Sequence, residues 1–210
     1  MTLAQELASF RTPTVVKVSE PSRAGERAPA HPILELPIGS RTVIVFLRHC
    51  GCPFAEKDYR QLYNIPAVRR GEVTGIAVSH SSNEDTKRWI DETTNDREHP
   101  LSTSTSYNTD TSLEGPRIKV VVDETRELYS AWGLGVSSAW HAFNPLTLAS
   151  VIALARREGI WNRTTNSGSR WQTAGAFAVD KDGAVHWAHI YPSGSDVGDL
   201  NEAARAIELV

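Results

Sequence analysis

Two cysteines, Cys50 and Cys52, are the residues of this chain best suited to chemistry. They lie in the run Arg48-His-Cys-Gly-Cys-Pro53, after an apolar stretch and before a segment with an approximate helical stripe. A thiol at the N-terminus of a helix is stabilised as the thiolate by backbone N–H groups and by the positive end of the helix dipole. Because the thiolate is the nucleophilic form, this position predicts nucleophilic or redox chemistry at Cys52.

The second cysteine is not where a Cys-x-x-Cys pair would place it. That position holds Ala55, and Cys50 instead precedes Cys52 with one glycine between them. A disulfide between residues so close in the chain is strained. We therefore expect either Cys50 or an external thiol to regenerate Cys52, and simple packing is an equal interpretation of Cys50.

Arg48 and His49 lie on opposite faces if the strand continues through them, so one of them points toward the reacting thiol. His49 is the better acid–base candidate, because an ordinary histidine exchanges a proton near neutral pH. Arg48 is a candidate substrate ligand, as are the residues that open the helix, Pro53 and Phe54. The charged residues of the first helical turn, including Glu56, are expected to face solvent.

Composition argues against several other functions. The formal net charge is −3, and no basic stripe suggests a nucleic-acid partner. The seven histidines lack the paired spacing of a zinc site, so we expect no metal and no other cofactor. No run approaches the roughly 18 apolar residues of a membrane span, and the N-terminus lacks the pattern of a secretion signal. These features predict a cytoplasmic protein that acts on a small molecule.

Strand and helix patterns alternate around the cysteines. Apolar, β-branched runs bounded by turn residues predict strands, and each is followed by a segment with helical features. The predicted strands are Thr42–Leu47, Val73–Ser79 and Ile118–Val122. The predicted helices are Pro53–Tyr63, about 82–92 and Glu124–Trp132. Such strand–helix units imply parallel strands in one sheet.

The C-terminal half adds different elements. An apolar helix is expected from Pro145 to about Gly159, and the strands Ala174–Val179 and Ala184–His189 form a hairpin. A last helix is expected at about 196–208. Together these elements predict a thioredoxin-like three-layer α/β sandwich with a central mixed sheet and an added helical insertion. Residues 36–210 would form this domain, with insertions at about 93–116 and 136–172, and residues 1–35 an N-terminal arm or strand.

Two further groups could reach the cysteine. Gln172 and Thr173 precede the hairpin, where such folds bring a loop beside the site, so either could contact substrate, although a plain turn is an equal interpretation. The tryptophans of the second insertion, among them Trp140 and Trp161, either fill the core or cover a pocket for a bulky organic molecule.

Three blocks of sequence, in this order, resemble the peroxiredoxin-like branch of the AhpC/TSA antioxidant family. They are Phe46-Leu-Arg-His-Cys-Gly-Cys-Pro53, Val122-Asp-Glu-Thr-Arg-Glu-Leu-Tyr-Ser-Ala-Trp-Gly-Leu134 and Trp171-Gln-Thr-Ala-Gly175. The resemblance implies a thioredoxin-like fold and a thiol oxidoreductase in which Cys52 attacks a peroxide or disulfide. It also makes an external thiol reductant and a homodimer plausible partners.

The chain departs from the family pattern at two positions. Family members carry Cys-Pro-x-Cys, where this chain has Ala55, and they place Thr or Ser where this chain has His49. These departures leave two other hypotheses open. One is the same fold repurposed for isomerisation, elimination or cyclisation of a hydrophobic metabolite, with His49 or Cys52 as acid or base. The other is a binding module without catalysis.

Overall fold

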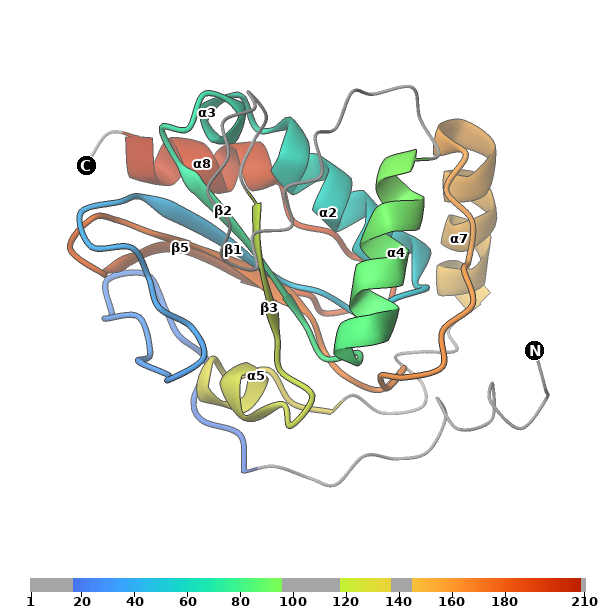
Figure 1. Ribbon diagram of the computed structural model, residues 1–210, viewed down its shortest axis with the longest axis horizontal. Helices are drawn as coiled ribbons and strands as arrows, with labels where there is room; N and C mark the ends of the chain where they lie inside the picture. The colour runs from blue at the N-terminus through green and yellow to red at the C-terminus, as the bar shows by residue number, and fades with distance from the viewer. Residues whose placement is uncertain (1–16, 96–117, 137–144, 209–210) are drawn as a thin grey trace.

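The sheet has the mixed topology that the sequence predicts. A computed structural model describes residues 17–95, 118–136 and 145–208. Its five strands follow the order β3-β2-β1-β4-β5 (Figure 1). They are β1 (Thr42–Phe46), β2 (Thr74–Ser79), β3 (Ile118–Val122), β4 (Gly175–Val179) and β5 (Val185–Ile190). The first three strands are parallel, and the β4–β5 hairpin adds antiparallel pairs beside β1.

The helices include all those predicted, with changed boundaries, and one short helix, Pro66–Arg69, that the sequence did not predict. They are α2 (Pro53–Asn64), α3 (Pro66–Arg69), α4 (Asn83–Asn95), α5 (Glu127–Ala131), α7 (Pro145–Glu158) and α8 (Leu200–Glu208). The predicted start of the last helix near residue 196 is wrong, because Asp199 accepts the first free N–H groups of α8 and so begins it. The predicted start of α5 at residue 124 is also wrong, because Arg126 takes a left-handed backbone conformation before the helix.

Both faces of the sheet are covered, which makes three layers. Alternate residues of β1 point to opposite faces, and both sets are buried. Val43 and Val45 belong to the cluster formed with α2, α4 and α8, whereas Ile44 and Phe46 pack with α5. Figure 1 shows α2 and α8 on one side of the sheet and α5 on the other. The expectation of a thioredoxin-like α/β sandwich is confirmed.

The described part of the N-terminal segment docks on the domain without forming a long strand. Ser19 donates its N–H to the carbonyl of Ser130 on α5, at 3.0 Å. Further along, Gly25 and Glu26 exchange backbone hydrogen bonds with Val185 at the start of β5. Residues 1–16 of the predicted N-terminal arm or strand lie outside the described residues. None of the helices described here is both long and apolar enough to cross a membrane.

Tyr129 of α5 joins this helix to the ends of the two central parallel strands. Its side chain is fully buried, and its hydroxyl oxygen lies 2.7 Å from the carbonyl oxygen of Leu47 and 2.8 Å from that of Val78. Burial raises the pKa of Tyr129 well above its ordinary value, so the hydroxyl stays protonated and donates hydrogen bonds. The phenol therefore fixes the strand end that leads into the cysteine motif.

Replacing Tyr129 by phenylalanine is expected to lower the free energy of unfolding by about 1–3 kcal/mol, because two buried carbonyl groups lose a donor. Urea unfolding measures the change. The matched control is Tyr59→Phe, since no protein partner of the Tyr59 hydroxyl is found among the described residues. The Tyr59 ring packs against Trp89, and a phenylalanine ring can keep this contact. Equal losses in the two variants would contradict this account of Tyr129.

Candidate active site around Cys52

Cys52 lies at the N-cap of α2, as the sequence predicts. Its carbonyl accepts the N–H of Glu56 at 3.2 Å, and its half-buried side chain makes no capping hydrogen bond. Pro53 has no N–H group, and within the described chain no acceptor is found for the N–H groups of Phe54 and Ala55. These two donors sit at the positive end of the helix, where they can stabilise a thiolate or an oxygen that gains negative charge.

Apolar side chains surround one side of this cysteine. Cys52 packs against a small cluster that α2, α7 and the segments after α7 and β5 supply. Its members are Phe54, Val151, Leu154, Ile160 and Val197. A nucleophile in such surroundings meets little water and favours a substrate with an apolar part.

Only some of the tryptophans with a predicted role lie in the part of the chain that the structure describes. Trp161 follows the buried Ile160, but its own side chain is 65% exposed, so it does not fill the core. Trp140 lies outside the described residues, and its predicted contact with substrate stays a prediction.

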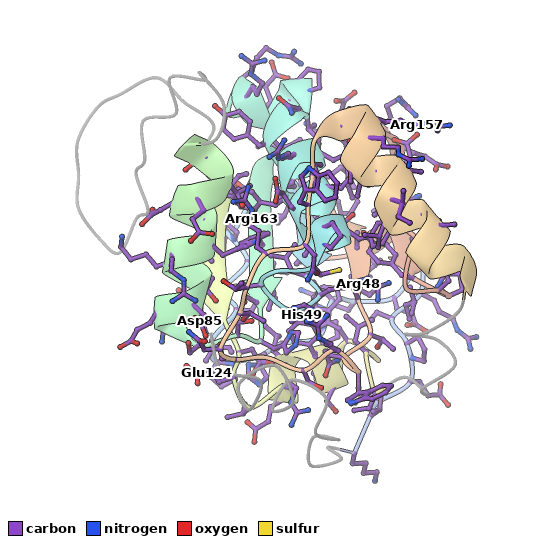
Figure 2. The ribbon with its side chains drawn as sticks, turned by 90° about the vertical axis from the view of Figure 1, so that its right-hand side faces the viewer. Arg48, His49, Asp85, Glu124, Arg157 and Arg163 are labelled. Carbon is purple, nitrogen blue, oxygen red and sulfur yellow. The ribbon has the colours of Figure 1, made fainter. Side chains whose placement is uncertain are left out.

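A segment far away in the sequence covers the cysteine motif. This covering segment, residues 160–172, runs between α4 and α2 in Figure 2 and carries Arg163. The N–H of Arg163 donates to the carbonyl of Gly51 at 2.9 Å. Gly51 has φ +118°, and a Cβ there would lie 2.6 Å from the carbonyl oxygen of Arg163. The close approach therefore requires glycine between the two cysteines.

Glu56 is buried, and the expectation that it faces solvent is wrong. Its carboxylate forms ion pairs with Arg60 of the same helix and with Arg163, whose Nε lies 2.9 Å from Oε2. The covering segment removes Glu56 from water and at the same time provides a counter-charge. The helical pattern could not show this partner, because it comes from a distant part of the chain.

Cys50 is enclosed by hydroxyl groups on the other side of the motif. Its sulfur lies 3.4 Å from Oγ of Ser79 and 3.7 Å from Oγ1 of Thr86, and its N–H donates to Ser81. Burial raises the pKa of the Cys50 thiol, although these hydroxyl groups act in the opposite direction. Both cysteines are free thiols, and Cys50 belongs to the main core cluster. This environment favours the packing interpretation of Cys50.

His49 does not have the ordinary pKa that its predicted acid–base role requires. It is buried beneath Gly168 of the covering segment, with Nδ1 3.3 Å from the Cys50 carbonyl. Burial lowers the pKa of His49 to about 3, and the positive charge of Arg170 acts in the same direction. Its neighbour His80 is also buried, and burial lowers its pKa to about 4. Both rings are therefore neutral at physiological pH.

Arg48 turns away from His49 toward the other side of the motif, as their alternation predicts; both are labelled in Figure 2. Its guanidinium donates to the carbonyl of Ser193 at 2.5 Å and lies 5.9 Å from the ring centre of Tyr191. The Tyr191 hydroxyl donates to Asp58, which is fully buried. Burial raises the pKa of Asp58 to about 8, although the charge of Arg48 lowers it. No local pattern in the sequence indicates that this carboxyl group is buried.

Gln172 and Thr173 are held by the segment that follows α5. The amide of Gln172 donates to the carbonyls of Leu134 and Gly135, at 3.2 and 3.0 Å. The backbone N–H and the hydroxyl of Thr173 both donate to Gly135, each at 2.9 Å. These contacts fit the interpretation of the pair as a turn, and their predicted role in binding substrate stays a prediction. No group of three or more possible metal ligands occurs in the described parts of the chain.

Comparison with known proteins agrees with the geometry. Residues 62–193 match the family model described as "AhpC/TSA antioxidant enzyme". No curated protein sequence matches the chain. The match begins after the cysteine motif, so the choice of Cys52 as nucleophile depends on its position at the helix N-terminus.

Solved structures share the fold at low sequence identity. A peroxiredoxin-like protein from Aquifex aeolicus is 15% identical, with 93% of this chain and 92% of that chain covered, at a TM-score of 0.56. A mutant of the peroxiredoxin 6 of Arenicola marina is also 15% identical, at a TM-score of 0.50. There the match covers 80% of this chain but only 60% of the Arenicola protein. The chain has a peroxiredoxin-like, thioredoxin-like fold and belongs to the AhpC/TSA antioxidant enzyme family.

Proposed function

We propose that the protein is a thiol peroxidase that uses Cys52 to reduce an organic hydroperoxide. The observation that carries the proposal is the half-buried Cys52 at the N-cap of α2, where two N–H groups of the first helical turn have no acceptor among the described residues. The apolar cluster beside the thiol supports a substrate with an apolar substituent over hydrogen peroxide.

The first step transfers two electrons from sulfur to the peroxide. The Cys52 thiolate attacks the terminal oxygen of the hydroperoxide, so an S–O bond forms as the O–O bond breaks. The alcohol leaves after its oxygen takes up a proton, and Cys52 becomes a sulfenic acid. The N–H groups of Phe54 and Ala55 stabilise the negative charge that moves from sulfur toward oxygen.

An external thiol supplies the two electrons for regeneration. Its attack on the sulfenic acid releases water and forms a mixed disulfide, and a second thiol then frees Cys52 and leaves as a disulfide. This route is supported over resolution by Cys50, because Cys50 is buried and burial raises the pKa of its thiol. The non-redox hypothesis finds no support in His49, whose neutral ring is a weak base at neutral pH.

Cys52→Ser is expected to reduce the consumption of cumene hydroperoxide, with dithiothreitol as reductant, to the rate without protein. Cys50→Ser, the matched control, should keep turnover because the external thiol, and not Cys50, regenerates Cys52. Trapping with dimedone and intact-mass measurement should place the sulfenic acid on Cys52. Full activity of Cys52→Ser refutes the proposal, and loss of turnover in Cys50→Ser with sulfenic acid retained identifies Cys50 as the resolving thiol.

A further inference from the structure

Arg163 contacts the chain on both sides of Cys52. Before the cysteine, its backbone N–H binds the carbonyl of Gly51 at 2.9 Å. After the cysteine, its guanidinium binds Glu56, with Nε 2.9 Å from Oε2 and Nη2 3.4 Å from Oε1. One residue of the covering segment therefore contacts both the turn before Cys52 and the first turn of α2 after it. Figure 2 labels Arg163.

Glu56 is an obstacle to thiolate chemistry unless its charge is offset. It follows Cys52, the N-cap residue of α2, by four positions, so it lies about one helical turn further along the chain. Its side chain is 1% exposed, so water screens its charge poorly. A nearby carboxylate disfavours the thiolate form of a cysteine, because the two negative charges repel.

Two guanidinium groups offset this charge, and they differ in where they come from. Arg60 pairs with Glu56 from within α2 and has this neighbour whenever the helix forms. Arg163 reaches Glu56 only when the covering segment is in place, and it also lies 3.7 Å from Glu92 of α4. The next charged residue of α2, Lys57, pairs instead with Glu158 of α7.

We propose that Arg163 is a positioning residue that makes Cys52 reactive by offsetting the charge of Glu56 and by holding the Gly51 turn. The proposal rests on the proposed function only in taking Cys52 as the reacting atom. The guanidinium of Arg163 affects Cys52 by offsetting the charge of Glu56, and its backbone N–H affects Cys52 by holding Gly51 in place.

The test measures the alkylation rate of Cys52 by iodoacetamide at pH 7 and pH 10, in a Cys50→Ser background. The rate at pH 10 reports access to the sulfur, and the ratio of the two rates reports how strongly the thiolate is favoured. Arg163→Gln is expected to lower this ratio about tenfold. Adding Glu56→Gln to that variant should restore the ratio, and Arg163→Lys should lose less than Arg163→Gln.

Two further variants separate charge from stability. Arg205→Gln removes a surface guanidinium that pairs with Asp199 and should leave the ratio unchanged. Glu56→Gln alone should raise the ratio, which gives a test even if Arg163→Gln fails to fold. An unchanged ratio in Glu56→Gln, or failure of Glu56→Gln to rescue a folded Arg163→Gln, overturns the proposal. Peroxidase activity in Cys52→Ser would refute the proposed function instead, and would leave the alkylation result valid.

Discussion

An Asp58→Asn variant is expected to gain stability relative to the parent protein as the pH rises from 5 to 8. Burial raises the pKa of Asp58 from 3.8 to about 8, so the folded protein holds a proton that the unfolded chain releases over this range. The stabilising contribution is complete below about pH 4 and is lost as the pH rises through 8. Asparagine cannot titrate, and the difference between the two proteins should approach about 1.4 kcal/mol per pH unit.

The two buried histidines act with the opposite sign. Burial lowers the pKa values of His49 and His80 from 6.5 to about 3 and about 4, so the unfolded chain binds protons that the folded protein does not. Their contribution is present above pH 6.5 and is lost as the pH falls toward these values. Since Asp58 lowers stability on the alkaline side, the three groups together predict a maximum near neutral pH.

Urea unfolding at pH 5, 6.5 and 8 measures both effects. Because the histidines are the same in the parent and in Asp58→Asn, the difference in unfolding free energy isolates the carboxyl group. Asp182→Asn in the exposed β4–β5 turn is the control and should follow the parent at every pH. A constant difference between Asp58→Asn and the parent would mean that Asp58 is ionised in the folded protein.

Gly51→Ala is expected to damage both stability and catalysis. Gly51 has a backbone angle that L-residues rarely adopt, and its new methyl group would meet a backbone oxygen rather than a flexible side chain. The backbone strain alone costs about 1–3 kcal/mol. Relief of the clash must move the covering segment or the turn, so the peroxidase rate should fall as Cys52 leaves its place at the helix.

Gly71→Ala separates strain from the clash. Gly71 also has a positive φ, +73°, but a Cβ there meets nothing within 4 Å. This variant should lose stability to a similar backbone strain and should keep its peroxidase rate. Unfolding in urea and hydroperoxide consumption are measured on both variants. If Gly51→Ala keeps the parent rate, the approach of the covering segment does not matter for catalysis.

The strands and the position of Cys52 were predictable because their signals are local. β1 and β3 are apolar β-branched runs, and Pro53 marks the first residue of α2. The start of α8 was missed because Asp199 captures its first N–H groups three residues later than the expected boundary. Such a choice between neighbouring capping residues depends on geometry that the periodicity of a helix does not contain.

The surroundings of Cys52 were not predictable, because they come from distant residues. Burial beneath the segment that carries Gly168 lowers the pKa of His49, and the charge of Arg170 acts in the same direction. Glu56 is buried, and Arg163, one of its two guanidinium partners, comes from a distant part of the chain. A single sequence shows the residue types of such a site but not the contacts that set their charge.

The position of β1 has a consequence for the order in which the protein is assembled during synthesis. β1 pairs with β2 soon after it in the chain, but its other neighbour is β4, in the C-terminal part. The residues that cover Gly51 and His49 also come late, at positions 163 and 168. A nascent chain that ends before them has the cysteine without its enclosure, and the pairing of β1 with β4 is the kind of long-range contact that forms slowly. Cys52 therefore acquires the surroundings seen in the folded protein only when the last third of the chain has been made.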